Sequence, residues 1–65
     1  MKARYFQDTD TLHLELRDSE VVETRDLDED TILDYDDQGK VVGITLEHAR
    51  TRVGGAKIEL ETVEV

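Results

Sequence analysis

The chain has 65 residues, of which 17 are acidic and 8 are basic, a formal net charge of −9, and no cysteine or proline. The lack of cysteine excludes a disulfide framework and a thiolate metal site, and the negative charge argues against nucleic acid or an anionic membrane as partner. With no apolar run near the roughly 20 residues of a membrane span and no signal-peptide pattern at Met1–Asp10, we expect a cytoplasmic protein.

So short a chain predicts a single domain, residues 1–65, with a thin core. Oligomerisation commonly stabilises domains of this size. We therefore expect a homodimer or a higher oligomer.

The first half of the chain predicts three strands. Lys2–Phe6 alternates loosely, whereas Thr11–Leu16 alternates cleanly, with three leucines on one face. That alternation is typical of a half-buried strand in an antiparallel sheet. β-Branched residues in Val21–Leu27 predict a third strand. The connections are polar and rich in aspartate, as turns often are.

Thr31–Leu46 predicts a β-hairpin, because two strand-forming runs flank a turn sequence. The glycine suits the left-handed position that follows a type I turn, since it has no Cβ to clash there. Such a loop fixes the register, with Tyr35 opposite Val41 and Ile32 opposite Ile44. The predicted turn residues are Asp36, Asp37, Gln38 and Gly39.

This register would place apolar residues on both faces of the hairpin. The first face would carry Ile32, Val42, Ile44 and Leu46. The second would carry Leu33, Tyr35 and Val41, which we take as the candidate subunit interface because aromatic side chains anchor interfaces. The chain itself can cover one of these faces, and the other would be covered by a helix, a C-terminal strand or another subunit. Gly43 suggests a bulge or a close backbone approach.

The C-terminal third gives a weaker pattern. Glu47–Val53 is either two helical turns ended by Gly54 or an extension of the preceding strand. Lys57–Val65 alternates and predicts a strand, which at an exposed edge could pair with another chain. The predicted fold is mostly β, with α+β possible: an antiparallel meander of four to five strands with at most one short helix near residues 47–53.

Several of these residues form a known pattern. The chain resembles the YuzE-like family of small bacterial and archaeal domains over about Tyr5–Leu46. Two departures are His13, where an aromatic is usual, and the acidic residue after the Gly-Ile pair, which is displaced to Glu47. The resemblance implies an α+β or mostly β domain without an established activity. It also implies an antitoxin-like role, because some members of the family are encoded beside small toxin-like proteins. The residues that carry it are Tyr5, Asp8, Asp10, Leu12, Leu14, Glu23-Thr24, Ile32–Asp36, Gly39 and Val41–Ile44.

Residues with possible chemistry point away from catalysis. Ser19 is the only serine and has no histidine near it in sequence, so we expect no enzyme activity. Asp34 and Asp36 superficially follow the first half of a calcium loop, but Thr45 occupies the twelfth position, where a glutamate is needed. His13 and His48 could join a glutamate to bind zinc, although surface histidines are the better interpretation. We expect no cofactor and no metal.

Three functions are consistent with the sequence. The first is a small non-enzymatic domain for protein interaction or self-association. The second is an antitoxin-like neutraliser of a small basic protein, using the acidic surface and the C-terminal strand. The third is a domain that binds a metal or a small ligand through its aspartate-rich turns.

Overall fold

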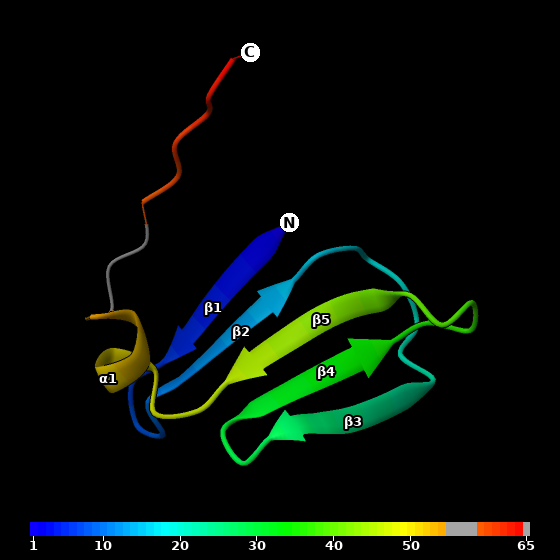
Figure 1. The fold of residues 1–65 in the computed structure, drawn as a ribbon, viewed down its shortest axis with the longest axis horizontal. Coiled ribbons are helices and arrows are strands. Elements are labelled where there is room, and N and C mark those ends of the chain that lie inside the picture. The colour runs from blue at the N-terminus through cyan, green and yellow to red at the C-terminus, as the bar shows by residue number, and fades with distance from the viewer. Residues whose placement is uncertain (55–58, 65) are drawn as a thin grey trace.

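A computed structural model describes residues 1–54 and 59–64, which form a five-stranded antiparallel sheet and one short helix (Figure 1). The prediction of a mostly β fold with one short helix near residues 47–53 is confirmed. The elements are β1 (Lys2–Phe6), β2 (Thr11–Glu15), β3 (Glu23–Asp28), β4 (Thr31–Tyr35), β5 (Val41–Leu46) and α1 (Ala49–Val53).

The strands lie in the order β1-β2-β5-β4-β3. Three of the four pairings are hairpins between consecutive strands, whereas β2 pairs with β5, so the first hairpin docks against the last strand. β5 is therefore the central strand, and β1 and β3 are the two edges. The predicted meander is wrong in this respect, because a meander would pair β2 with β3.

The predicted C-terminal strand is wrong over residues 59–64, which have no regular secondary structure. Residues 57, 58 and 65 of the predicted strand lie outside the described residues. Figure 1 shows that 59–64 point away from the sheet, beyond α1. Their side chains are exposed, and Leu60 is 84% exposed.

The predicted hairpin register holds only next to the turn. Tyr35 pairs with Val41 as expected, but a bulge follows, and Leu33 pairs with Ile44. Since a one-residue shift moves every later side chain to the opposite face, Leu33 and Ile44 share a face and Ile32 pairs with Thr45. The predicted grouping of Ile32 with Ile44 and Leu46 on one face is therefore wrong, because these last two residues share the face of Leu33.

The face that carries Ile32 is mainly polar. His13 Nδ1 is hydrogen-bonded to Thr45 Oγ1 at 2.8 Å, and Thr24 Oγ1 donates to Asp34 Oδ1 at 2.9 Å. A Cβ built on Gly43 would lie 2.8 Å from Asp34 Oδ2. Glycine is needed at this buried position of β5 because the Asp34 side chain passes directly over it.

Two of the buried core residues lie at the end of the sheet where α1 is attached. Leu12 is 6% exposed and Ala49 is 1% exposed. Leu12 belongs to a row of paired residues on adjacent strands, with Tyr5 on one side and Leu46 and Thr31 on the other. The helix lies at this end of the sheet, whereas Val42, which is 2% exposed, is buried near the start of β5, at the other end.

Candidate interaction surface

The row next to the core crosses all five strands and is largely apolar. Paired residues of antiparallel strands point to the same face, and here the pairing runs from Ala3 through Leu14, Ile44 and Leu33 to Arg25. Tyr35 and Val41 form the next pair on the same face. We call five of these residues the open face: Leu14, Leu33, Tyr35, Val41 and Ile44.

Every residue of the open face is only half-buried, including Ile44 on the central strand. A covered residue of the central strand would be almost fully buried, as Val42 of the same strand is at 2% exposed. Neither α1, which lies at one end of the sheet, nor the exposed residues 59–64, which point away from it, covers the open face. The candidate interface residues Leu33, Tyr35 and Val41 are therefore joined on one surface by Leu14 and Ile44.

An arginine borders the open face at β3. The Arg25 guanidinium carbon lies 5.4 Å from the centre of the Tyr35 ring, and Arg25 Nη2 lies 2.9 Å from Glu23 Oε2. Cation–π stacking and this ion pair hold the arginine against the tyrosine ring. Tyrosine and arginine are both enriched at the centres of protein interfaces.

One end of α1 is attached to the β1–β2 turn. Asp10 has a left-handed backbone, with φ of 54°, and its Oδ1 accepts hydrogen bonds from the Tyr5 hydroxyl at 2.7 Å and the Arg50 amide at 3.1 Å. Its carbonyl accepts from the Ala49 amide at 3.0 Å. From its neighbours in sequence Asp10 is only a turn residue, because the helical residues that bond to it lie about 40 positions later.

The other attachment of α1 is to the β3–β4 turn. His48 Nδ1 lies 2.9 Å from Asp30 Oδ1, and Arg52 donates to the Asp30 carbonyl and to Thr31 Oγ1. The Glu47 amide also donates to the Asp30 carbonyl, at 2.8 Å. The two attachments place a five-residue helix across one end of the sheet, and leave the other end uncovered by it.

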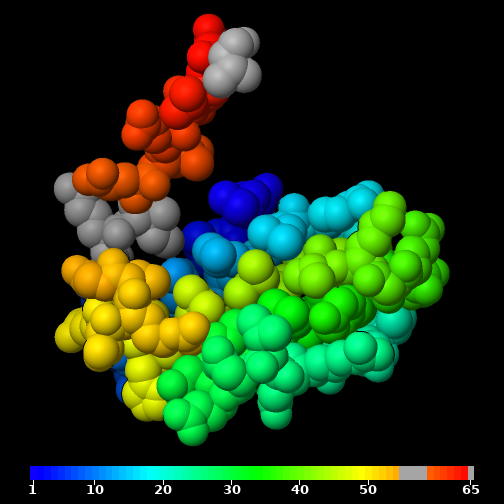
Figure 2. All heavy atoms as spheres, viewed as in Figure 1, coloured from blue at the N-terminus to red at the C-terminus, as the bar shows by residue number. Residues whose placement is uncertain are grey.

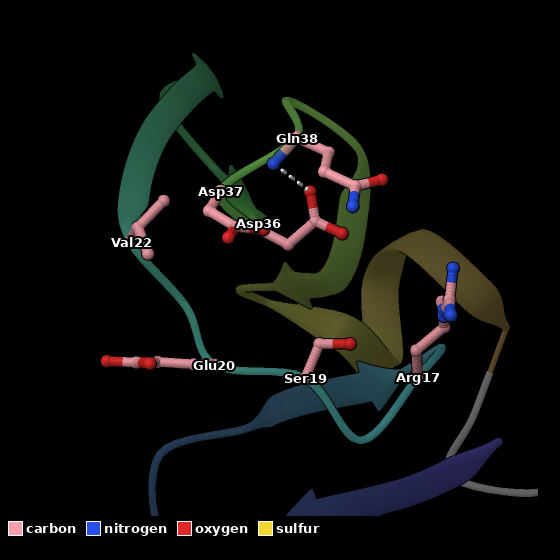
Figure 3. Close-up of a pocket in the computed structure, with 7 residues that line it drawn as sticks. All are labelled: Arg17, Ser19, Glu20, Val22, Asp36, Asp37 and Gln38. Carbon is pink, nitrogen blue, oxygen red and sulfur yellow. Dashed lines mark hydrogen bonds between the residues drawn. The ribbon is translucent and has the colours of Figure 1, made fainter.

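The β4–β5 turn borders a hollow of about 340 Å³ at the opposite end of the sheet. Gly39 has the predicted left-handed φ, 77°, and its amide donates to the Asp36 carbonyl at 3.1 Å. Figure 3 shows the lining side chains spread around the hollow, and the hydrogen bond drawn there joins the Gln38 amide to the Asp36 carboxylate. The lining residues are Arg17, Ser19, Glu20, Val22, Asp36, Asp37 and Gln38.

The structure gives the predicted chemical residues separate partners. Ser19 lines the hollow without a histidine among the described lining residues. His13 is bonded to Thr45 and His48 to Asp30, so the two histidines do not share a site. Across residues 1–54 and 59–64, no group of three or more His, Cys, Asp or Glu side chains is arranged to hold a metal ion.

Hydrogen bonds lower the pKa of three carboxylates in or next to turns. The Tyr5 hydroxyl is the main cause for Asp10, the Asp30 amide for Asp28, and the Lys40 amide for Asp36. The same Tyr5–Asp10 bond raises the pKa of Tyr5. The ionised aspartates and the neutral tyrosine are the forms that the fold stabilises.

These lowered pKa values predict loss of stability in acid. Each carboxylate stabilises the fold above its unfolded-state pKa, near 3.8, and loses that contribution as the pH falls through its lower folded-state pKa. We expect the free energy of unfolding to be nearly constant from about pH 7 to pH 5 and to fall below about pH 4. Urea unfolding at a series of pH values measures this. Asp36→Asn should flatten the curve, and the exposed neighbour Asp37→Asn should not.

Comparison with known proteins gives a family but no activity. The family model described as "Protein of unknown function (DUF2283)" matches residues 2–50, which include all five strands. No curated protein and no solved structure matches the chain significantly. Within the described residues, the structure contains no helix with the length and apolarity that a membrane crossing requires. Since the family model covers more than half of the sequence, the chain belongs to the DUF2283 family of proteins of unknown function.

Proposed function

We propose that this chain is a non-enzymatic interaction domain that forms a homodimer by packing its open face against the open face of a second copy. The observation that carries the proposal is the half-buried state of Leu33 and Ile44, which lie on the adjacent strands β4 and β5. A contiguous apolar surface of this kind is typical of an interaction site. Packing two such faces would give each copy the second layer that its sheet lacks.

A second copy is the occupant that the composition of this surface favours. The open face contains no acidic residue, although the chain carries a net charge of −9. Face-to-face packing therefore buries no carboxylate on this surface and keeps the acidic residues at the rim or on the polar face. The same apolar face, if free in solution, would suit a heterologous partner, with the acidic surface attracting a small basic protein.

The test compares two neighbouring residues of β4. Leu33→Lys places a charge on the open face, and Ile32→Lys places the same charge on the polar face of the same strand. We expect the wild-type chain and Ile32→Lys to have twice the chain mass in light scattering, and Leu33→Lys to weaken dimerisation by about tenfold or more. Circular dichroism of each variant verifies that the sheet is retained.

Equal dimerisation of the two variants would overturn the proposed interface. A folded wild-type monomer at about 100 μM would overturn self-association, since a stable interface holds copies together well below that concentration. Raised salt should not dissociate the proposed dimer, because it screens the repulsion between two acidic chains while leaving apolar contacts intact.

A further inference from the structure

The edge strand β1 and the segment 59–64 have opposite charge and matching alternation. Lys2 and Arg4 project from the same face of β1, since they pair with Glu15 and His13 on the polar face of the sheet. They are two of the eight basic residues of the chain, and β1 contains no acidic residue. The segment carries Glu59, Glu61 and Glu64, separated by uncharged residues.

We propose that residues 59–61 of one chain add to the free edge of β1 in a second copy, as a sixth strand, and that the two copies exchange these segments reciprocally. This strand exchange rests on the proposed homodimer and adds a second contact to it. Addition of an extended segment to an exposed sheet edge supplies backbone hydrogen bonds, and the side chains set the choice of edge. Reciprocal exchange closes a symmetric dimer.

The alternation of the segment fits β1 on both faces of the sheet. With Glu59 and Glu61 beside Arg4 and Lys2 on the polar face, Leu60 falls beside Ala3. Ala3 begins the row that continues into the open face, so Leu60 would extend the apolar surface by one strand. In the structure Leu60 is 84% exposed, and Figure 2 shows residues 59–64 standing clear of the sheet.

Charge distinguishes the two edges of the sheet. β3 is the other free edge, and it carries three acidic residues, Glu23, Asp26 and Asp28, against the single basic Arg25. A segment with three glutamates would be repelled from β3 and attracted to β1, where neither Lys2 nor Arg4 forms a salt bridge with any described residue. Like charges placed opposite one another in a sheet are destabilising.

The position of α1 favours exchange with the copy that packs on the open face. Arg50 contacts Tyr5 and Arg52 contacts Thr31, and both contacted residues belong to the row beside the open face. The helix therefore lies on the side of the sheet from which the second copy would approach. Among the described residues, β1 keeps a free edge with which a segment of that copy could pair.

The test uses two charge-reversed forms of the full-length chain. The tail variant is Glu59→Lys/Glu61→Lys, and the edge variant is Lys2→Glu/Arg4→Glu. Each alone places like charges at both exchange sites, so we expect each to weaken homodimerisation by about tenfold. Mixed together, they offer a basic tail to an acidic edge and an acidic tail to a basic edge. The mixture should form a heterodimer with wild-type affinity, measured by light scattering and by native mass spectrometry.

A matched control separates local pairing from overall charge. Glu20→Lys/Glu29→Lys gives the same net charge as the tail variant at two exposed positions outside the segment. This control should keep its homodimer and should not pair preferentially with the edge variant. Equal preference of the control and the tail variant for the edge variant would overturn the exchange.

The remaining outcomes distinguish this proposal from the proposed interface. If neither reversed variant loses affinity while Leu33→Lys does, the strand exchange is wrong and the open-face dimer stands. If the reversed variants lose affinity and recover it on mixing while Leu33→Lys has no effect, the exchange stands and the open-face contact is wrong. Weakened homodimers that do not recover on mixing would mean that the segment pairs with β1 of its own chain, which also overturns the exchange.

Discussion

Replacement of Leu12 by alanine is expected to unfold most of the chain at 37 °C. Leu12 on β2 is 6% exposed and is one of the three buried hydrophobic residues in the described part of the chain. A buried leucine truncated to alanine costs about 2–5 kcal/mol, and a core of this size rarely supplies more than about 3–5 kcal/mol in total. One substitution can therefore remove most of the free energy of unfolding.

The chain offers a matched control for this prediction. Leu60→Ala removes the same atoms from a side chain that is 84% exposed, so the monomer should lose almost nothing. Urea unfolding followed by circular dichroism, with all variants at one protein concentration, gives both values. A Leu12→Ala chain as stable as Leu60→Ala would show that the contact between helix and sheet does not form the core.

Replacement of Ala49 by glutamate is expected to release α1 from the sheet. Ala49 is 1% exposed at the start of the helix, and a carboxylate there would lose its hydration without gaining a cation in the same space. The carboxylate regains its hydration if the helix detaches from the sheet. Detachment also breaks the hydrogen bonds from Arg50 to Tyr5 and from Arg52 to Thr31. We expect a loss of about 3 kcal/mol or more.

Thr51→Glu is the control for this change, because it adds the same charge at an exposed position of the same helix. It should alter the free energy of unfolding by less than about 0.5 kcal/mol. Hydrogen exchange gives a local measurement: the Ala49 amide, which donates to the Asp10 carbonyl, should lose protection only in Ala49→Glu. Continued protection of that amide in Ala49→Glu would contradict detachment.

The strands themselves could be predicted from local pattern. The alternation of Thr11–Leu16 and the two runs flanking Gly39 depend on neighbouring residues, and the sequence contains that information directly. The hairpin faces could not be predicted in the same way. A register counted outward from the turn is inverted by one bulged residue, and the bulge lies between the Tyr35–Val41 and Asp34–Gly43 pairs. Gly43 indicated a bulge, but a glycine does not determine which side chains move to the other face of the sheet.

The candidate surface was partly predictable, because three of its residues belong to one hairpin and are close in sequence. Leu33, Tyr35 and Val41 were identified as one group, and the structure places them on a half-buried face. Their neighbours Leu14 and Ile44 were not identified, since Leu14 comes from a hairpin that docks on β5 only in the folded chain. The contacts of Asp10 and Asp30 with α1 also depend on long-range packing, so the sequence showed only two turn residues.

The pairing of β2 with β5 has a consequence for the order of folding. Each of the three hairpins joins strands that are close in sequence, whereas Leu14 meets Ile44 only after the whole β3–β4 hairpin has been bridged. The entropy lost in closing a loop grows with its length, so this pairing is the most costly one to nucleate. The β1–β2 hairpin and the β3–β4–β5 unit can each form early, and their joining along β5 is the step at which the native topology is decided.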